Sequence, residues 1–282
     1  MNRPIIGRTV ASAIAVAMLV ACTTTTEEGT VGVQRSQLIL VSSADMEKAA
    51  ATQYQQLIST ESPKGNVNRD PKQTERVRGI AKRLIPQTAV FRKDAVDWKW
   101  EVNVLTSPEV NAWCMPGGKI AVYTGLIEKL QITDDELAAV MGHEISHALR
   151  EHGRERASQQ MAAGAGASLA GVVADIFLPG SGQLATQGAS LGTQVGVLLP
   201  YSRVHETEAD RMGVELAARA GYDPRAAIVL WQKMAKLAGG SGSQSSLAAF
   251  LSTHPTNETR MKDLTEFSQK VLPLYEEARA RK

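Results

Sequence analysis

The sequence predicts an α+β fold that is mostly helical, with a small β-hairpin or sheet beside one central helix. Three observations support this class. Apolar residues recur at helical spacing around residues 77–85, 137–148 and 228–234. Residues 98–105 change to the alternating pattern of a half-buried strand, and a Pro-Gly-Gly turn leads into a second short apolar run at 119–124. A chain of 282 residues is long enough to bury a sizeable core around these elements.

The composition excludes one broad class of function. The formal net charge is +2, and aromatic residues make up 5% of the chain. No run of basic residues is interleaved with aromatic ones, as a nucleic-acid-binding surface would require. We therefore expect no nucleic-acid partner.

The first 22 residues have the features of an export signal. Two arginines provide positive charge, and the apolar run at 10–20 is too short to span a bilayer comfortably. The run ends in Leu-Val-Ala-Cys, which resembles the lipobox of bacterial lipoproteins, where cleavage precedes a cysteine that is then lipidated. We expect a lipid anchor at Cys22, since several acyl chains hold a protein stably at a membrane. The alternative is an ordinary signal peptide with a cysteine near its cleavage site by chance.

The residues after the signal indicate a compartment. Thr23, in place of Asp, favours the outer membrane by resemblance to enterobacterial lipoprotein sorting, so the expected location is the periplasm with an outer-membrane lipid anchor. Cys114 is the only other cysteine, and no intrachain disulfide can form if Cys22 is lipidated. We expect Cys114 to be a buried small hydrophobe, with an intermolecular disulfide as the alternative in an oxidising compartment.

The mature chain is expected to begin as a tether and to continue as one domain. Residues 23–43 are rich in Thr and Gly, which is typical of a tether, and residues 44–282 are expected to form the domain. A first helix is predicted from 44 to 59. An Asp-Pro pair at 70–71 favours the start of the next helix, and Pro86 favours its end.

Two strands are predicted before the central helix. Along residues 98–105 two tryptophans and two valines fall on one face, with polar residues on the other. Residues 119–124 form the second strand after the glycine turn. The pattern leaves two uses open: a hairpin in the core, or a sheet whose exposed edge pairs with an extended peptide.

The next segment carries the chemistry. Residues 143–147 read His-Glu-Ile-Ser-His within a predicted helix. Side chains four residues apart share one face of a helix, so His143 and His147 can converge on one metal ion, with Glu144 beside it. This arrangement suits a zinc hydrolase, in which the carboxylate takes the proton of a zinc-bound water. The alternative is that these are ordinary histidines on a helix face.

The surroundings of the motif favour a helix. Thr133 and Glu136 have the spacing of a capping box, and acidic residues fill the first turn. Gly153 is the predicted end of the helix.

Beyond it, residues 161–200 are dominated by small residues, and polar side chains interrupt their apolar runs. We interpret this region as helices around a turn at 179–182 that form a cover over the site, with a partial membrane dip as the minor alternative.

A catalytic zinc site needs a third protein ligand. His152 is disfavoured, because on a continuous helix it lies about 140° from His147 and faces away from the metal. Glu206 and Asp210 are four residues apart and share a face. One of these carboxylates can bind the metal while the other accepts the second ring N–H of a ligand histidine.

Two neighbours of these carboxylates are weaker candidates. Glu208 points to the opposite side of the same predicted helix. His205 competes with Glu206 as a ligand, but it has no carboxylate on its own face to orient it.

The C-terminal part, residues 222–282, is predicted to be helical. Gly221 ends the preceding helix, an Asp-Pro pair starts another, and residues 239–246 form a flexible linker. A His-Pro pair at His254 then precedes a helix that contains Arg260. A histidine at a helix start without a chemical role is the alternative to a functional His254.

Three motifs occur together in this chain. They are His143-Glu144-x-x-His147, then Ser202-Arg203-x-x-Glu206-x-Glu208-Ala209-Asp210, and Asn111-Ala112-x-x-x-Pro116-Gly117-Gly118-Lys119 followed by Tyr123-Thr124-Gly125-Leu126. Together they resemble the HtpX, Oma-type and CAAX-prenyl-protease family of gluzincin metallopeptidases over roughly residues 44–271. With the lipobox, the chain is most similar to the stand-alone periplasmic lipoproteins of this family, the LoiP-like group. The resemblance implies a zincin-like catalytic core.

The resemblance also implies roles for individual residues. One Zn²⁺ per chain would be bound by His143, His147 and Glu206, with Glu144 as the base and Asp210 orienting a ligand. His254 would lie near the zinc, where it either stabilises the oxyanion, as Arg260 also would, or caps the metal at rest. The residues expected to contact the substrate backbone are Asn111, Lys119, Ile120, Ala121, Val122 and Tyr123.

The resulting hypothesis is a membrane-tethered periplasmic zinc endopeptidase that cleaves unfolded or misassembled envelope proteins. The main alternative is a non-catalytic assembly factor or chaperone of the outer membrane that uses the same groove for binding. A membrane-bound processing enzyme is the third class. We do not expect prenylated substrates, because no convincing transmembrane helix surrounds the motif.

Overall fold

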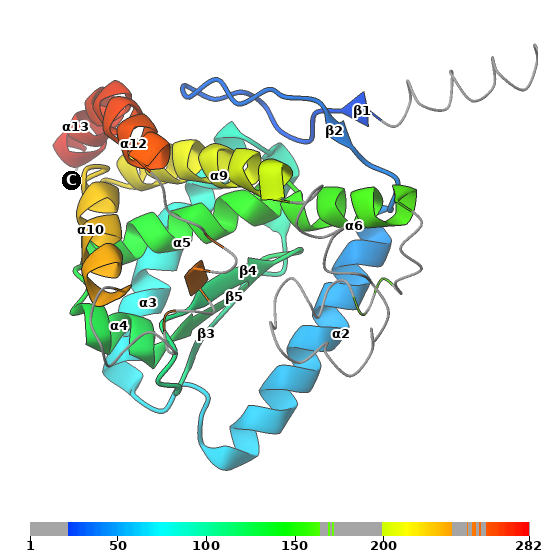
Figure 1. Cartoon of the computed structure of the whole chain (residues 1–282). Helices are drawn as coiled ribbons and strands as arrows, with labels where there is room; N and C mark the ends of the chain where they lie inside the picture. Colours follow the sequence, from blue (N-terminus) through cyan, green and yellow to red (C-terminus); the bar gives the residue numbers. More distant parts are fainter. Residues whose placement is uncertain are drawn as a thin grey trace, which may run out of the picture.

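Figure 1 shows the computed structural model of the chain. It describes residues 22–163, 199–238, 258–281 and, individually, 169, 171, 247, 250, 251 and 254. The predicted signal peptide up to residue 21, most of the predicted cover at 161–200 and the predicted linker at 239–246 lie outside these residues. The described part confirms a mainly helical α+β fold with a small sheet.

A three-stranded sheet lies below the central helices in Figure 1. Its strands are β3 (Glu101–Leu105), β4 (Ala112–Met115) and β5 (Lys119–Tyr123), in the order β3-β5-β4. β5 pairs parallel with β3 and antiparallel with β4. The two predicted strands are therefore parallel neighbours rather than a hairpin. The hairpin partner of β5 is β4, whose four buried residues have no alternating pattern that would predict a strand.

The strand order corrects one prediction about substrate binding. Because β5 is central, its backbone groups pair with strands on both sides. The prediction that β5 offers its edge to a peptide is therefore wrong for Lys119, Ile120, Ala121, Val122 and Tyr123. The edge strand packed against the central helix is β4, which Asn111 directly precedes.

From residue 22 onward, two α-helices precede the sheet. α2 (Ser43–Glu61) begins at Ser42, whose hydroxyl accepts a hydrogen bond from the Asp45 N–H, and a short 3₁₀ turn, η1 (Ser62–Lys64), follows it. α3 (Pro71–Leu84) begins at Asp70, whose carboxylate accepts the first free N–H groups as predicted. The chain then continues through the 3₁₀ segments η2 (Ile85–Val90) and η3 (Lys93–Asp97).

The motif lies in α5 (Asp134–Leu149), which follows α4 (Thr124–Leu130). The predicted capping box is present: the Glu136 N–H donates to Thr133 Oγ1 at 3.3 Å, and the Thr133 N–H donates to Glu136 Oε2 at 2.7 Å. The predicted end at Gly153 is wrong. Glu151 adopts a left-handed conformation with φ of 54°, and a new helix, α6 (His152–Ala162), starts directly after it.

α9 (Leu199–Arg219) runs alongside α5, as Figure 1 shows. Glycines allow the two backbones to touch. A Cβ atom built on Gly142 would lie 2.8 Å from the Gly213 carbonyl oxygen, and one on Gly213 would lie 2.7 Å from the His143 nitrogen. This close approach places the histidines of α5 opposite the acidic residues of α9.

The C-terminal helices close one end of the domain. They are α10 (Ala226–Ala238), α12 (Glu258–Lys270) and α13 (Leu272–Ala280). Gly221, with φ of 73°, follows α9 as predicted. One hydrophobic core joins α3, the sheet, α5, α9 and α10. Among the described residues, no helix combines the length and the apolar character needed to cross a bilayer.

The N-terminal segment, defined here as residues 22–41, packs against the domain. It includes the paired short strands β1 (Cys22–Thr23) and β2 (Gln37–Leu38). Val31 and Val33 are buried in the main core, and the Glu215 carboxylate of α9 accepts the backbone N–H groups of Thr30 and Val31. The sequence predicts a tether between membrane and domain at residues 23–43, whereas these contacts pack much of that stretch against the folded domain.

Candidate metal centre

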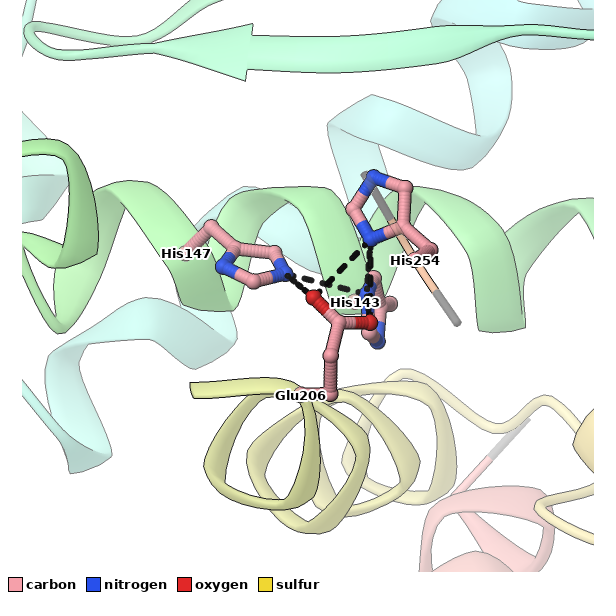
Figure 2. Close-up of side chains that lie close together, drawn as sticks. All are labelled: His143, His147, Glu206 and His254. Atoms are coloured by element: carbon pink, nitrogen blue, oxygen red, sulfur yellow. Dashed lines mark hydrogen bonds and ion pairs between the residues drawn. The ribbon is translucent and has the colours of Figure 1, made fainter. Parts of the chain in front are cut away.

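Four side chains converge between α5 and α9. His143, His147, Glu206 and His254 each offer one atom, and these atoms all lie within 4.8 Å of one another. Figure 2 shows the two imidazoles of α5 and the Glu206 carboxylate of α9 pointing toward one another, with the His254 ring beside them. His143 Nε2 lies 3.0 Å from His147 Nε2 and 3.5 Å from Glu206 Oε2, and His147 Nε2 lies 3.3 Å from Glu206 Oε1.

The donor set fits a zinc ion. Ligands at about 2.0–2.1 Å from a tetrahedral zinc are about 3.4 Å apart, which matches the separations between the two histidine nitrogens and the Glu206 oxygens. Two imidazoles and one carboxylate are also the ligands of a catalytic zinc. The structure therefore brings together the three residues that the sequence analysis selects as ligands.

Asp210 orients His143. Its Oδ1 lies 2.9 Å from His143 Nδ1, so the ring donates that N–H and turns Nε2 toward the cluster. Burial lowers the pKa of His143, but hydrogen bonds to Asp210 and Glu206 outweigh it and raise the pKa to about 10. Asp210 is thus placed as predicted, one turn from Glu206.

Arg260 of α12 holds both acidic residues. Its Nη1 donates to Glu206 Oε2 at 2.9 Å, its Nη2 donates to Asp210 Oδ1 at 2.9 Å, and its Nε contacts Asp210 Oδ2. Burial opposes ionisation of Glu206, but the charges of His254 and Arg260 hold its pKa well below the usual range. The resemblance implies a role for Arg260 at the oxyanion. In the structure its buried guanidinium pairs with the carboxylates of Glu206 and Asp210.

Glu144 lies next to the cluster and is 4% exposed. Its Oε1 is buried without a hydrogen-bond partner among the described residues and lies 3.6 Å from His254 Nε2. Burial is the main reason that the pKa of Glu144 is raised. A buried carboxylate with a free oxygen beside a metal site is suited to accept a proton from water.

His254 is the fourth member of the cluster. Its Nδ1 lies 3.2 Å from His143 Nε2 and 3.0 Å from Glu206 Oε2, and its ring packs on Phe250 with centroids 4.5 Å apart. These contacts place a ring nitrogen of His254 within the cluster. The neighbouring Pro255 lies outside the described residues.

Behind His147 lies a residue that the sequence analysis places facing away from the metal. His152 Nδ1 is 2.8 Å from His147 Nδ1, and His152 Nε2 is 3.0 Å from Glu208 Oε2. The helix break at Glu151 turns His152 back toward His147, which the assumption of a continuous helix could not predict. Burial, reinforced by the charge of His205, holds the pKa of His152 well below its usual value.

His205 does not join the metal cluster. Its Nε2 lies 3.1 Å from Glu155 Oε2, and its ring stacks on His152 with centroids 4.4 Å apart. The sequence analysis finds no carboxylate partner on its own helix face. The partner comes instead from α6, a contact between segments that helical spacing cannot reveal.

Other predicted site residues lie away from the cluster. Lys119 Nζ forms an ion pair with Glu101 Oε1 at 2.9 Å at the start of the sheet. Asn111 is buried, and its Oδ1 accepts the Ala112 N–H at 2.9 Å, at the beginning of β4. The backbone of Cys22 pairs with Leu38 in β1.

Comparisons with known proteins agree with this geometry. The model of the family described as "Peptidase family M48" matches residues 71–268, which include both metal-binding helices. The mitochondrial metalloendopeptidase OMA1 of Schizosaccharomyces pombe is 35% identical over 191 residues, which cover 68% of this chain and 52% of that protein.

Two further relatives extend the comparison. The Arabidopsis thaliana mitochondrial metalloendopeptidase OMA1 is 38% identical over 183 residues, covering 64% of this chain and 34% of that protein. The β-barrel assembly-enhancing protease of Escherichia coli is 27% identical over 209 residues, covering 73% of this chain and 41% of that protein. The chain spans about half or less of the length of these relatives. Since the family model covers more than half of the chain and includes the metal cluster, the chain belongs to peptidase family M48.

Proposed function

We propose that this protein is a zinc metalloendopeptidase. The observation that carries the proposal is the cluster of His143, His147 and Glu206 with Glu144 next to it, whose Oε1 has no hydrogen-bond partner in the described part of the chain. These three residues would hold a zinc ion, which would supply the Lewis-acid chemistry needed to polarise a peptide carbonyl and to make water acidic. Two similar proteins are named as metalloendopeptidases.

The chain's own residues divide the remaining work. Glu144 accepts a proton from the attacking water at Oε1 and delivers it to the leaving amine. Its raised pKa favours both steps, because a base whose pKa lies closer to neutrality also returns the proton readily. Asp210 and Arg260 keep His143 and Glu206 in position, so the ligands need no rearrangement during the reaction.

His254 occupies the position of a fourth donor in the proposed resting state. A catalytic zinc keeps one position open for water or substrate, so His254 has to leave the cluster before a peptide binds. Replacing His254 by Ala is therefore expected to raise the rate of peptide hydrolysis. A fall in rate would instead favour a role for His254 in stabilising the oxyanion.

Substrate is proposed to approach along β4. Tyr123 donates its N–H to the Asn111 carbonyl, so alternate residues of β4, Ala112 and Cys114, direct their backbone groups away from β5. An extended peptide can pair with this edge, which packs against the metal-binding helix α5. The mode of binding is the one suggested by the sequence, transferred from β5 to the edge strand.

The proposed setting is the periplasm, with a lipid anchor at Cys22 and the outer membrane as the site of attachment. The signal and lipobox residues support this placement. Unfolded or misassembled envelope proteins are the proposed substrates, since pairing at a strand edge recognises extended backbone rather than sequence. One relative is named as a β-barrel assembly-enhancing protease, which supports a substrate class at the envelope.

The Glu144→Gln variant tests the activity. It is expected to bind one zinc ion per chain and to lose casein hydrolysis by at least a hundredfold, because the amide cannot accept the proton. Glu101→Gln is the matched control, since Glu101 lies in the sheet away from the cluster. Unchanged hydrolysis by Glu144→Gln would refute the proposal. If the native protein hydrolyses no casein, and a strain that lacks the protein fails to assemble outer-membrane proteins, the results would instead favour a chaperone.

A further inference from the structure

The side of His147 that faces away from the metal cluster leads into a chain of buried polar groups. His147 contacts His152, which contacts Glu208, and Glu208 is held by Arg35 of the N-terminal segment. All three intermediate contacts lie between 2.8 and 3.0 Å. We call these residues, from His147 to Arg35, the histidine relay.

The hydrogen-bond directions along the relay follow from its far end. Glu208 is an acceptor, because Arg35 donates to it from Nε at 3.0 Å and from Nη2 at 3.1 Å. His152 must therefore donate its Nε2–H to Glu208. In a neutral ring, Nδ1 of His152 is then an acceptor, and the short contact to His147 requires His147 to donate its Nδ1–H.

This direction leaves one arrangement for His147. With the proton on Nδ1, the lone pair of Nε2 points into the cluster, 3.3 Å from Glu206 Oε1. Asp210 imposes the same tautomer on His143 through a direct carboxylate contact. For His147 the orienting carboxylate is Glu208, and it acts through His152 rather than by direct contact.

We propose that His152 and Glu208 are positioning residues that fix His147 as a metal ligand through Nε2, and that Arg35 completes the relay. The inference rests on the proposed zinc site, but it gives His152 and Glu208 a role at that site and extends the site to Arg35 of the N-terminal segment, which lies outside the matched region. Arg35 is anchored firmly, since it also donates to both oxygens of the buried Glu155, at 2.7 and 2.8 Å.

The N-terminal segment is thereby part of the metal site. Arg150, which is fully buried, ties the two together: its Nη1 donates to Thr24 Oγ1 at 2.8 Å, and its Nε lies 3.4 Å from Glu208 Oε2. Removal of the Arg35 side chain is expected to leave Glu208 with only the longer arginine contacts, from Arg150 at 3.4 and 3.5 Å. The Glu208 carboxylate would then hold His152, and through it His147, less firmly.

Zinc affinity of the full chain tests the proposal, measured at neutral pH by competition with a chromogenic chelator. His152→Leu, which removes the acceptor, is expected to bind zinc 10- to 100-fold more weakly. His152→Gln carries one acceptor and one donor at similar reach and is expected to recover most of this loss. Arg35→Met is expected to lose about tenfold, at the lower end of that range. Arg211→Met, which removes the same charge from an ion pair between α9 and Asp263 of α12, is the control and is expected to leave affinity unchanged.

Two further readings separate positioning from folding. The urea midpoint of each metal-free variant reports stability, and the visible absorption of the Co²⁺-loaded variants reports the ligand field. We expect His152→Leu and His152→Gln to have similar midpoints, with the cobalt spectrum altered only in the leucine variant. If His152→Leu and His152→Gln bind zinc with equal affinity, whether that affinity is native or weakened, the proposal is overturned. If native protein and Glu144→Gln bind zinc alike but neither hydrolyses casein, the proposed function fails while the relay still stands.

Discussion

The contact between Gly142 and Gly213 sets the separation of the two metal-binding helices, and one substitution probes it directly. In Gly213→Ala the new Cβ would lie 2.7 Å from the His143 nitrogen and 2.9 Å from its Cα atom. Ordinary contacts begin at 3.4 Å, so the helices would have to separate by several tenths of an ångström. Both opposing atoms belong to the backbone, and rotation of a side chain cannot relieve the clash.

Overpacking of this kind costs about 1–3 kcal/mol of the free energy of unfolding. The displaced residue is itself a ligand, and movement of His143 lengthens its path to Glu206. We therefore expect Gly213→Ala to lose about 2 kcal/mol in urea unfolding, and to bind zinc about tenfold more weakly, as for other losses of ligand support.

Gly79 supplies the matched control. It lies in the exposed interior of α3, and a Cβ built there meets nothing within 4 Å. Gly79→Ala is expected to gain about 0.5–1 kcal/mol, because alanine loses less backbone entropy in a helix. A Gly213→Ala protein as stable as the native one, with native zinc affinity, would refute the role given to the glycine contact.

Three further predictions concern the charges and the thiol. Asp210→Asn should lower the free energy of unfolding by about 3 kcal/mol, because the buried Arg260 loses a partner, whereas Asp263→Asn in a more exposed pair should cost about 1 kcal/mol or less in the same urea titrations. Zinc binding between pH 7 and 9 should release about one proton, because the pKa of His143 is raised to about 10 in the metal-free site, and the apparent zinc affinity should therefore increase with pH. Calorimetry in buffers of different ionisation enthalpy measures the number of protons released. The absence of proton release would contradict the prediction. Cys114 is buried, which raises the pKa of its thiol, so a colorimetric thiol reagent should react with it only after unfolding, and rapid reaction of the folded protein would count against this.

The central chemistry could be predicted from sequence because it depends on spacing within helices. His143 and His147 are one turn apart on α5, and Glu206 and Asp210 are one turn apart on α9, so each pair shares a face wherever the helices lie. The capping box at Thr133 is a local signal of the same kind and is present as predicted.

Features that depend on breaks or on distant partners could not be predicted in this way. The single left-handed residue Glu151 ends α5 early and redirects His152, although nothing in the local pattern requires that conformation. β4 is too short and too uniformly buried to alternate, so the sheet order remained hidden. In the N-terminal segment, the Thr- and Gly-rich composition predicts a tether, and the two valines that are buried in the structure, Val31 and Val33, are too few to predict a packed segment.

If the protein is anchored through Cys22 as proposed, the close packing of the N-terminal segment would also limit where it can act. Thr24 and Thr25 both contact Arg150, two and three residues after the proposed anchor at Cys22. Two extended residues span only about 7 Å, so the linker between a lipid at Cys22 and the folded domain would be short. Its catalytic centre would stay close to the membrane surface. Only polypeptides that are exposed at that surface could then bind to the site.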